Sequence, residues 1–98
     1  MWLDYDLLNE ALFGDNASDY RSKKEITDAM LAVLISREVF VLYLRFGKRN
    51  QLTLREAGKV VGVTSERIRQ VESKALRKLR GYFWDAKAQA KETQEPTL

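Results

Sequence analysis

The 98-residue sequence contains no cysteine and no histidine. These absences exclude disulfide frameworks, zinc sites built from cysteine or histidine, and histidine general bases. No apolar run approaches the roughly 20 residues that a membrane-spanning helix requires. The opening residues, MWLDYDLLNE, are acidic where a signal peptide would be basic. We therefore expect a cytoplasmic protein that has no membrane partner.

Nucleophile–base pairs, phosphate-binding loops and carboxylate clusters are also lacking, so the sequence offers no starting point for catalysis. We expect neither an enzyme nor a cofactor or metal site. At this length the chain can bury one modest core but not two. The predicted fold is all-α, a small helical domain of about four to five helices.

The net charge of +3 conceals a strong asymmetry along the chain. Residues 1–35 hold three basic and seven acidic side chains, whereas residues 36–84 hold twelve basic and four acidic ones. Residues 85–98 hold two basic and three acidic side chains. A basic block of this density is typical of a surface that neutralises phosphates. The alternative interpretation is a solvated, charged helix face.

The basic block contains the pattern of a helix, a tight turn and a second helix. Thr53 and Glu56 have the spacing of a capping box, which predicts a helix that begins near Leu54. Gly62 favours a left-handed end to this helix near Val61.

The turn and the crossing of the two helices depend on small residues. Gly58 lies where the first helix should cross the second, and a side chain there would hold the two apart. Val63 is expected to fill the gap between the helices. Thr64 or Ser65 can cap the second helix.

The second helix has two distinct faces. Apolar residues recur at three- and four-residue steps and predict one buried stripe: Ile68, Val71, Ala75, Leu76 and Leu79. Polar residues fall on the opposite face: Ser65, Glu66, Arg69, Gln70 and Ser73. These two helices predict a helix-turn-helix, which offers the start of its second helix to the major groove of DNA.

We divide the chain into three parts. Residues 1–21 form an acidic amino-terminal helix, over residues 2–13, and a polar loop. The helix carries an apolar stripe that either packs on the core or contacts a partner: Leu3, Leu7, Leu8, Ala11 and Leu12. Residues 22–84 form the helix-turn-helix domain. Residues 85–98 are a polar tail, predicted to be a fraying helix followed by disorder after Pro96.

Two further helices precede the helix-turn-helix. Ser22 and Glu25 predict a capping box for a helix over residues 23–34, which should bury Ile26, Met30, Val33 and Leu34. Residues 37–46, with Ser36 as the predicted cap, are apolar almost all round. The spacing assigns one side to the core: Val39, Leu42, Tyr43 and Phe46. The other side is either covered by the amino-terminal helix or exposed as a binding patch: Phe40, Val41 and Leu44.

After residue 80 the pattern changes. Gly81 is expected to interrupt the long basic helix. Three consecutive aromatic residues follow, Tyr82, Phe83 and Trp84, and they cannot share one helix face. At least one should therefore pack on the core while another stays exposed.

These motifs resemble a known family. The string TLREAGKVVGVTSERIRQVESKALRKLR resembles region 4.2 of the primary sigma factors of bacterial RNA polymerase, and LAVLISREVFVLYLRFG resembles region 4.1 in the same register. The resemblance covers roughly residues 25–81. Nothing resembles the sigma region that melts the promoter. In sigma factors, region 4.1 and the first helix of region 4.2 form a concavity that grips the flap-tip helix of the polymerase beta subunit, so the resemblance implies a similar groove here.

Four residues at the start of the second helix are candidate base readers. Glu66 can accept a hydrogen bond from cytosine, Arg69 can donate to guanine or a phosphate, and Gln70 can pair with adenine or contact thymine. This set matches the residues with which the sigma family reads the minus-35 promoter element. Ser65 stands where primary sigma factors usually carry arginine, so we expect a preferred sequence that differs from the consensus hexamer.

Other basic residues are candidate phosphate contacts, which position a protein without specifying sequence: Arg55, Lys59, Arg67, Lys74 and Arg77. For Arg67 and Arg77 the alternative role is a local ion pair with Glu66 or Glu72.

The leading hypothesis is a DNA-binding regulator, of bacterial or phage type, that resembles sigma region 4. It would bind promoter DNA and the polymerase beta flap, and could act with a second sigma-like subunit. One alternative is a dimeric helix-turn-helix repressor of a palindromic operator, paired through the amino-terminal helix or the aromatic cluster. Another is a protein-interaction module whose basic helix binds an acidic partner.

Overall fold

The computed structural model describes the backbone of residues 3–94 and the side chains of residues 3–84. Its helices are α1 (Tyr5–Phe13), the short 3-10 helix η1 (Ala17–Asp19), α2 (Lys23–Val33), α3 (Ser36–Arg45), α4 (Leu54–Val61) and α5 (Ser65–Gln94). The described chain forms no sheet, and a single antiparallel bridge joins Leu3 to Gly47. The predicted all-α fold with a helix-turn-helix is confirmed.

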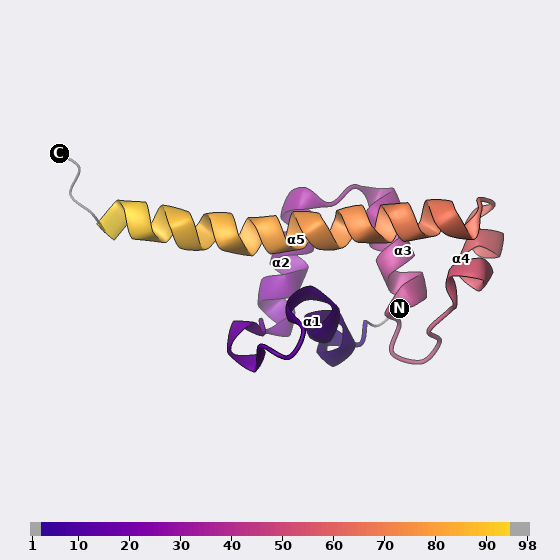
Figure 1. Cartoon of the computed structure of the whole chain (residues 1–98), viewed down its shortest axis with the longest axis horizontal. Coiled ribbons are helices and arrows are strands. Elements are labelled where there is room, and N and C mark those ends of the chain that lie inside the picture. Colours follow the sequence, from indigo (N-terminus) through magenta and orange to yellow (C-terminus); the bar gives the residue numbers. More distant parts are fainter. Residues whose placement is uncertain (1–2, 95–98) are drawn as a thin grey trace.

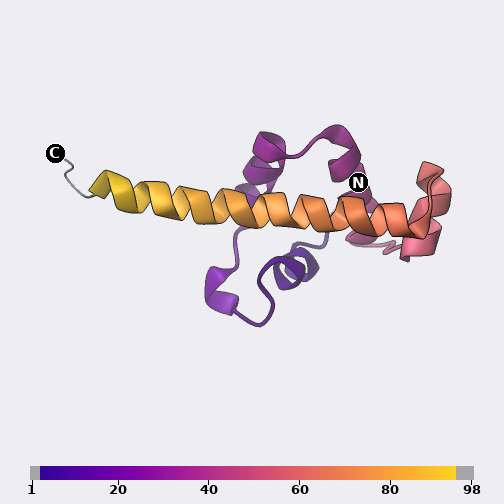
Figure 2. The same cartoon turned by 45° about the horizontal axis from the view of Figure 1, so that its top comes forward.

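The long helix α5 runs along the whole length of the molecule (Figure 1). Helices α1, α2 and α3 pack against its middle, and α4 lies at its amino end. The last turns of α5 extend past the other helices in both views (Figures 1 and 2). Among the described residues, no helix has the length and apolar character needed to cross a bilayer.

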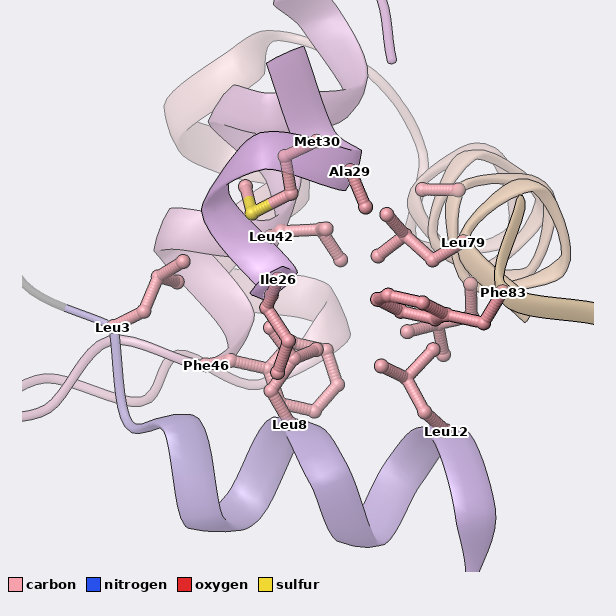
Figure 3. Packing of buried hydrophobic residues seen from close by; sticks show 12 residues of the cluster. Leu3, Leu8, Leu12, Ile26, Ala29, Met30, Leu42, Phe46, Leu79 and Phe83 are labelled. Atoms are coloured by element: carbon pink, nitrogen blue, oxygen red, sulfur yellow. The ribbon is translucent and has the colours of Figure 1, made fainter. Parts of the chain in front are cut away.

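One hydrophobic core joins α1 to α2, α3 and α5 (Figure 3). Its fully or nearly fully buried members are Leu3, Leu8, Leu12, Ile26, Ala29, Met30, Leu42, Phe46, Ala75, Leu76, Leu79 and Phe83. The apolar stripe of α1 therefore packs on the core, which was the first of its two predicted roles. Val33, Leu34, Val39 and Tyr43, all expected in the core, are only partly buried at its margin.

Helix α1 begins at Tyr5, later than the predicted residue 2. The reason is that Leu3 is held in extended backbone by its bridge to Gly47, and the Asp4 amide donates to the Phe46 carbonyl at 2.7 Å. Asp4 then caps the helix, because its carboxylate accepts from the Leu7 amide at 3.0 Å.

The predicted capping box of α2 is confirmed. The Glu25 amide donates to the Ser22 hydroxyl and the Ser22 amide donates to the Glu25 carboxylate, both at 3.2 Å. The predicted cap of α3 is wrong: Ser36 is the first helical residue and Ile35 is the N-cap. Since isoleucine has no side-chain acceptor, only the return bond exists, from the Ile35 amide to the Glu38 carboxylate at 3.0 Å.

The predicted interruption of α5 at Gly81 is also wrong. The helix continues through Gly81 to Gln94, and tertiary contacts hold the turns on either side of the glycine. Arg80 donates to the Leu12 carbonyl at 3.0 Å and Phe83 is buried in the core, whereas Trp84 is 58% exposed. Residues 85–94, expected to fray, are helical, and the predicted disorder after Pro96 lies outside the described residues.

Candidate nucleic-acid interface

The first helix of the helix-turn-helix forms as its local sequence predicts. The Glu56 amide donates to the Thr53 hydroxyl at 3.1 Å, and the Thr53 amide donates to the Glu56 carboxylate at 2.8 Å. The bond from the Thr53 amide to the carboxylate is the largest cause that lowers the pKa of Glu56. Gly62 ends α4 in the left-handed conformation, with φ of 84° and ψ of 32°.

Gly58 allows the turn to fold back onto α4. The amides of Gly62 and Val63 both donate to the Gly58 carbonyl, at 2.7 and 2.9 Å. A Cβ at Gly58 would lie 2.6 Å from the Val63 carbonyl oxygen. The close neighbour is therefore the turn that leads into α5, and not only α5 itself. Because the turn lies directly on Gly58, Val63 does not fill a gap between the helices as predicted, and it is 36% exposed.

A second, smaller core fixes α5 against α4 and α3. Its buried residues are Val41, Ala57, Ile68 and Val71. Val41 is fully buried in this cluster, so its predicted place in an exposed binding patch is wrong. The physical reason is that α4 and α5, rather than α1, cover this side of α3.

The start of α5 presents polar side chains to solvent while its neighbours are buried. Thr64 caps the helix, since its hydroxyl accepts from the Arg67 amide at 3.1 Å. The predicted base readers are all exposed: Ser65, Glu66, Arg69 and Gln70. On the opposite face of the same helix, Ile68 is fully buried and Val71 is nearly so. The packing of Ile68 and Val71 therefore fixes which face of α5 is free.

Glu66 and Arg69 form a two-pronged ion pair within this exposed face. Arg69 donates through Nη2 to Oε1 at 2.5 Å and through Nε to Oε2 at 2.9 Å. This contact lowers the pKa of Glu66 and raises that of Arg69. The predicted alternative partner for Glu66, Arg67, instead donates to Gln70 Oε1 at 3.4 Å. The exposed side chains of Glu66, Arg67, Arg69 and Gln70 are thus joined in two hydrogen-bonded pairs.

Arg45 has a structural role that the sequence did not indicate. It donates to the Glu72 carboxylate at 2.6 Å and to the Leu52 carbonyl at 2.8 Å. These bonds join the end of α3 and the α3–α4 loop to α5. Glu72 is therefore not the partner of Arg77, because it is engaged on the inner side of α5.

The five candidate phosphate contacts are all exposed: Arg55, Lys59, Arg67, Lys74 and Arg77. Among the residues whose side chains are described, none of them forms a salt bridge with a carboxylate. Two of them lie on α4, which stands at the amino end of α5 in Figure 1, and three lie on α5. The surface around the exposed start of α5 is thus basic and accessible to an anionic partner.

Comparison with known proteins decides the family. A family model described as sigma-70, region 4 matches residues 30–81, more than half of the chain. The chain belongs to the sigma-70 region 4 family. It is accordingly a sigma-factor-like DNA-binding domain and not an enzyme.

Two relatives are RNA polymerase sigma factors SigA. The chain is 53% identical over 73 residues to the one from Bacillus sp, with 72% of this chain and 19% of the relative covered. It is 54% identical over 63 residues to the one from Listeria monocytogenes serovar 1/2a, with 62% of this chain and 17% of the relative covered. The chain thus spans less than a fifth of the length of either relative. No solved structure matches the chain.

The region 4 match begins at Met30, so α1 and most of α2 lie outside it. Within the matched segment an apolar patch lies at the corner between α2 and α3. Leu31 is 80% exposed, Ile35 59% and Phe40 40%. Beside them is a groove of about 370 Å³ whose described lining residues carry no charge. We call Leu31, Ile35 and Phe40 the corner patch.

The corner patch differs from the patch predicted from sequence. Phe40 is exposed as predicted, Leu44 is partly buried against the smaller core, and Val41 is buried. Leu31 and Ile35 were missed, although Leu31 lies outside the buried stripe of α2 and this could have indicated its exposure.

Proposed function

We propose that this chain reads a minus-35-like promoter element through the start of α5 and binds RNA polymerase through the corner patch. The observation that supports the first part is the joint exposure of Glu66, Arg69 and Gln70 beside buried Ile68 and Val71. In a helix-turn-helix this end of the second helix enters the major groove, where base edges are distinguished.

Each polar group has a defined task in this proposal. One Glu66 oxygen accepts from a cytosine amino group while Arg69 holds the carboxylate in place. Gln70 contacts an adenine or a thymine next to it. Basic residues on α4 and α5, such as Lys59 and Lys74, contact phosphates on either side and set the docking angle. Ser65 cannot make the bidentate guanine contact of an arginine, so the preferred element differs from the consensus hexamer.

The DNA part is tested by titrating the full chain with a duplex that carries the minus-35 element and with single-base variants of it. Glu66→Gln and Gln70→Ala should each reduce the preference for the correct base pair over the variants about tenfold, at the one position that the substituted residue contacts. Lys59→Ala should instead weaken binding to all duplexes alike and reduce the salt dependence. If Glu66→Gln lost the same factor of affinity for every duplex, base reading by Glu66 would be contradicted.

The polymerase part rests on the corner patch and on the relatives, which are named as RNA polymerase sigma factors. Exposed large apolar residues that lie together on a small domain mark an interaction surface. We propose that the patch receives the flap-tip helix of the beta subunit.

A pulldown with core polymerase and with the isolated flap tests this part. Phe40→Ser and Leu31→Ser should each reduce recovery, because they remove exposed apolar contact area. Trp84→Ser is the control, since Trp84 is likewise a large exposed apolar residue, 58% exposed, but lies on α5 away from region 4.1 and from α4. Unchanged recovery with Phe40→Ser, or equal loss with Trp84→Ser, would contradict the proposed patch.

The alternative of a dimeric repressor loses much of its support. Its first dimer surface was the apolar stripe of α1, which is buried in the core, and its second was the aromatic cluster, of which Phe83 is buried. Exposed Trp84 remains. Sedimentation of the chain alone and on DNA separates the hypotheses, because an operator reader binds two-fold symmetric half-sites as a dimer. A heterodimer with a second sigma-like subunit would show in the same measurement when that subunit is added.

A further inference from the structure

Arg45 lies at the end of α3, and its guanidinium bonds to the segments that lead into both helices of the helix-turn-helix. Its Nε donates to Oε1 of Glu72 on α5 at 2.6 Å, and its Nη1 donates to the Leu52 carbonyl at 2.8 Å. Leu52 immediately precedes Thr53, the N-cap of α4. The Leu52 amide in turn donates to the Leu44 carbonyl at 2.9 Å. The last turn of α3 therefore holds both the beginning of α4 and one side of α5.

The bond between Arg45 and Glu72 is sheltered from water. The side chain of Arg45 is 24% exposed and that of Glu72 is 14% exposed, whereas both members of the Glu66–Arg69 pair are more than half exposed. Ion pairs that are open to water contribute little, because solvent and salt screen them. A charge-assisted hydrogen bond in a sheltered site is stronger, and it constrains direction as well as distance. It can therefore fix the orientation of a helix.

The place of Glu72 on α5 makes this bond sensitive to rotation of the helix. Successive residues are about 100° apart around the axis of an α-helix, so Glu72 is displaced by about 200° from Gln70. A rotation of α5 that moves Glu72 away from Arg45 turns Gln70 and Glu66 by the same angle. The apolar contacts of α5 with the smaller core are not directional. The ion pair thus adds a constraint that burial does not supply.

We propose that Arg45 is a positioning residue for base reading. Through Glu72 it sets the rotation of α5, and through the Leu52 carbonyl it sets where α4 begins, so that Glu66 and Gln70 meet the base edges correctly. Side chains that bind a ligand need neighbours that hold them in place. The inference rests on the proposed DNA reading and deepens it, because it assigns part of the specificity to a residue that contacts no base.

The experiment is a titration of the full chain with the duplex that carries the minus-35 element and with its single-base variants, each at several salt concentrations. Arg45→Met removes both hydrogen bonds and keeps a long side chain. It should reduce the preference for the correct base pair about three- to tenfold at the positions read by Glu66 and by Gln70 alike, because the whole helix turns. Glu66→Gln should reduce it at one position only. The salt dependence of binding should be the same for Arg45→Met as for wild type, since no phosphate contact is lost.

A second substitution tests whether Arg45 acts through Glu72. Glu72→Gln should reduce the preference at the same two positions. The double variant Arg45→Met/Glu72→Gln should lose no more than Arg45→Met alone, because both substitutions remove one interaction. Glu72→Gln leaves the bond to Leu52 in place, so it provides the measurement if Arg45→Met does not fold.

Lys78→Met is the matched control. Lys78 forms the other ion pair between α5 and α3, with Glu38 at 2.9 Å, and lies further along α5 from Gln70 than Glu72 does. Its loss should lower stability without releasing the start of α5, so the base preference should change by less than about twofold. Thermal unfolding followed by circular dichroism checks that each variant is folded at the temperature of the titration.

The outcomes separate this inference from the proposed function. Wild type that binds all duplexes equally would contradict base reading, and the role of Arg45 would fall with it. If wild type discriminates, any of three results overturns the role of Arg45 alone. Arg45→Met keeps the full preference, Lys78→Met loses as much preference as Arg45→Met, or Arg45→Met weakens binding to all duplexes alike with a smaller salt dependence. The last result would make Arg45 a phosphate contact.

Discussion

Glu38 and Glu66 are both paired with a cation, but their surroundings differ. Glu66 is exposed, and the hydrogen bonds from Arg69 lower its pKa. Glu38 is only 3% exposed, and Lys78 on α5 donates to it at 2.9 Å. Burial acts to raise the pKa of Glu38, but the hydrogen bonds from Lys78 and the Ile35 amide outweigh it and lower that pKa. Glu38 thus joins α3 to α5 inside the fold, whereas the pair formed by Glu66 stays on the surface.

The Glu38–Lys78 pair makes stability depend on pH. Because the folded pKa of Glu38 lies below its ordinary value of 4.5, the ionised group contributes stability above that value, and the contribution is lost as the pH falls through the folded pKa. Lys78→Met leaves a buried carboxylate without its ammonium, and we expect a loss of about 1–3 kcal/mol in the free energy of unfolding at pH 7.

Urea unfolding of wild type and Lys78→Met across pH 3–7 checks this expectation. The difference between them should shrink as the pH falls below about 4, because protonated Glu38 no longer requires the ammonium. Glu38→Gln is the control, since it removes the titrating group and with it this pH dependence. A Lys78→Met deficit that stays constant over the range would contradict the assignment.

At the scale of elements, the orientation of α5 depends on how closely the turn between α4 and α5 approaches α4. A glycine inside a helix normally costs about 0.5–1 kcal/mol relative to alanine. At Gly58 an added Cβ would lie 2.6 Å from the Val63 carbonyl oxygen, so alanine cannot replace the glycine without a shift of the backbone. The turn would have to move away, and the exposed start of α5, for which we propose DNA reading, would move with it.

Two glycine substitutions should therefore have opposite effects. Gly58→Ala should lower the free energy of unfolding by about 1–3 kcal/mol and weaken DNA binding, because the turn must shift. Gly81→Ala should raise it by about 0.5–1 kcal/mol, since a Cβ there meets nothing within 4 Å. Thermal unfolding and a DNA titration of both variants make the comparison. A higher free energy of unfolding for Gly58→Ala would contradict this expectation, because it would mean that the turn can shift without loss of stability.

At the scale of the whole molecule, α1 is an integral part of the fold. It lies outside the region 4 match, yet its Leu8 is fully buried and Leu12 nearly so, in contact with the core that the matched helices build. Burying a leucine contributes about 1.5–3 kcal/mol. We therefore expect α1 and the helix-turn-helix to unfold together.

Leu8→Ala tests this expectation. The substitution should cost about 2–5 kcal/mol through lost burial and a cavity, and the protein should still unfold in one transition. Leu31→Ala, at an 80% exposed position, should change stability by less than about 0.5 kcal/mol. Far-ultraviolet circular dichroism and tryptophan fluorescence should give coincident transitions for both. Separate transitions would mean that α1 folds independently.

Local sequence rules predicted the elements of this fold well. The capping boxes at Ser22 and Thr53 and the left-handed Gly62 formed as expected, because each depends on residues three or four positions apart. The buried stripe of α5 was also predicted, since helical periodicity alone places Ile68, Val71, Ala75, Leu76 and Leu79 on one face. The exposure of Glu66, Arg69 and Gln70 follows from that same periodicity.

Tertiary structure decided the rest. The sequence could not show that Val41 is covered by α4 and α5, that Arg45 holds Glu72, or that Lys78 holds a buried Glu38. Arg45 and Glu72 are 27 positions apart in the sequence, and Glu38 and Lys78 are 40 apart. No helical periodicity or capping motif relates residues at such separations. The same holds for Gly81, where a local helix breaker is overruled by the packing of Phe83. Backbone and capping energies act over a few residues and set where helices form, whereas burial and charge pairing depend on which helices meet.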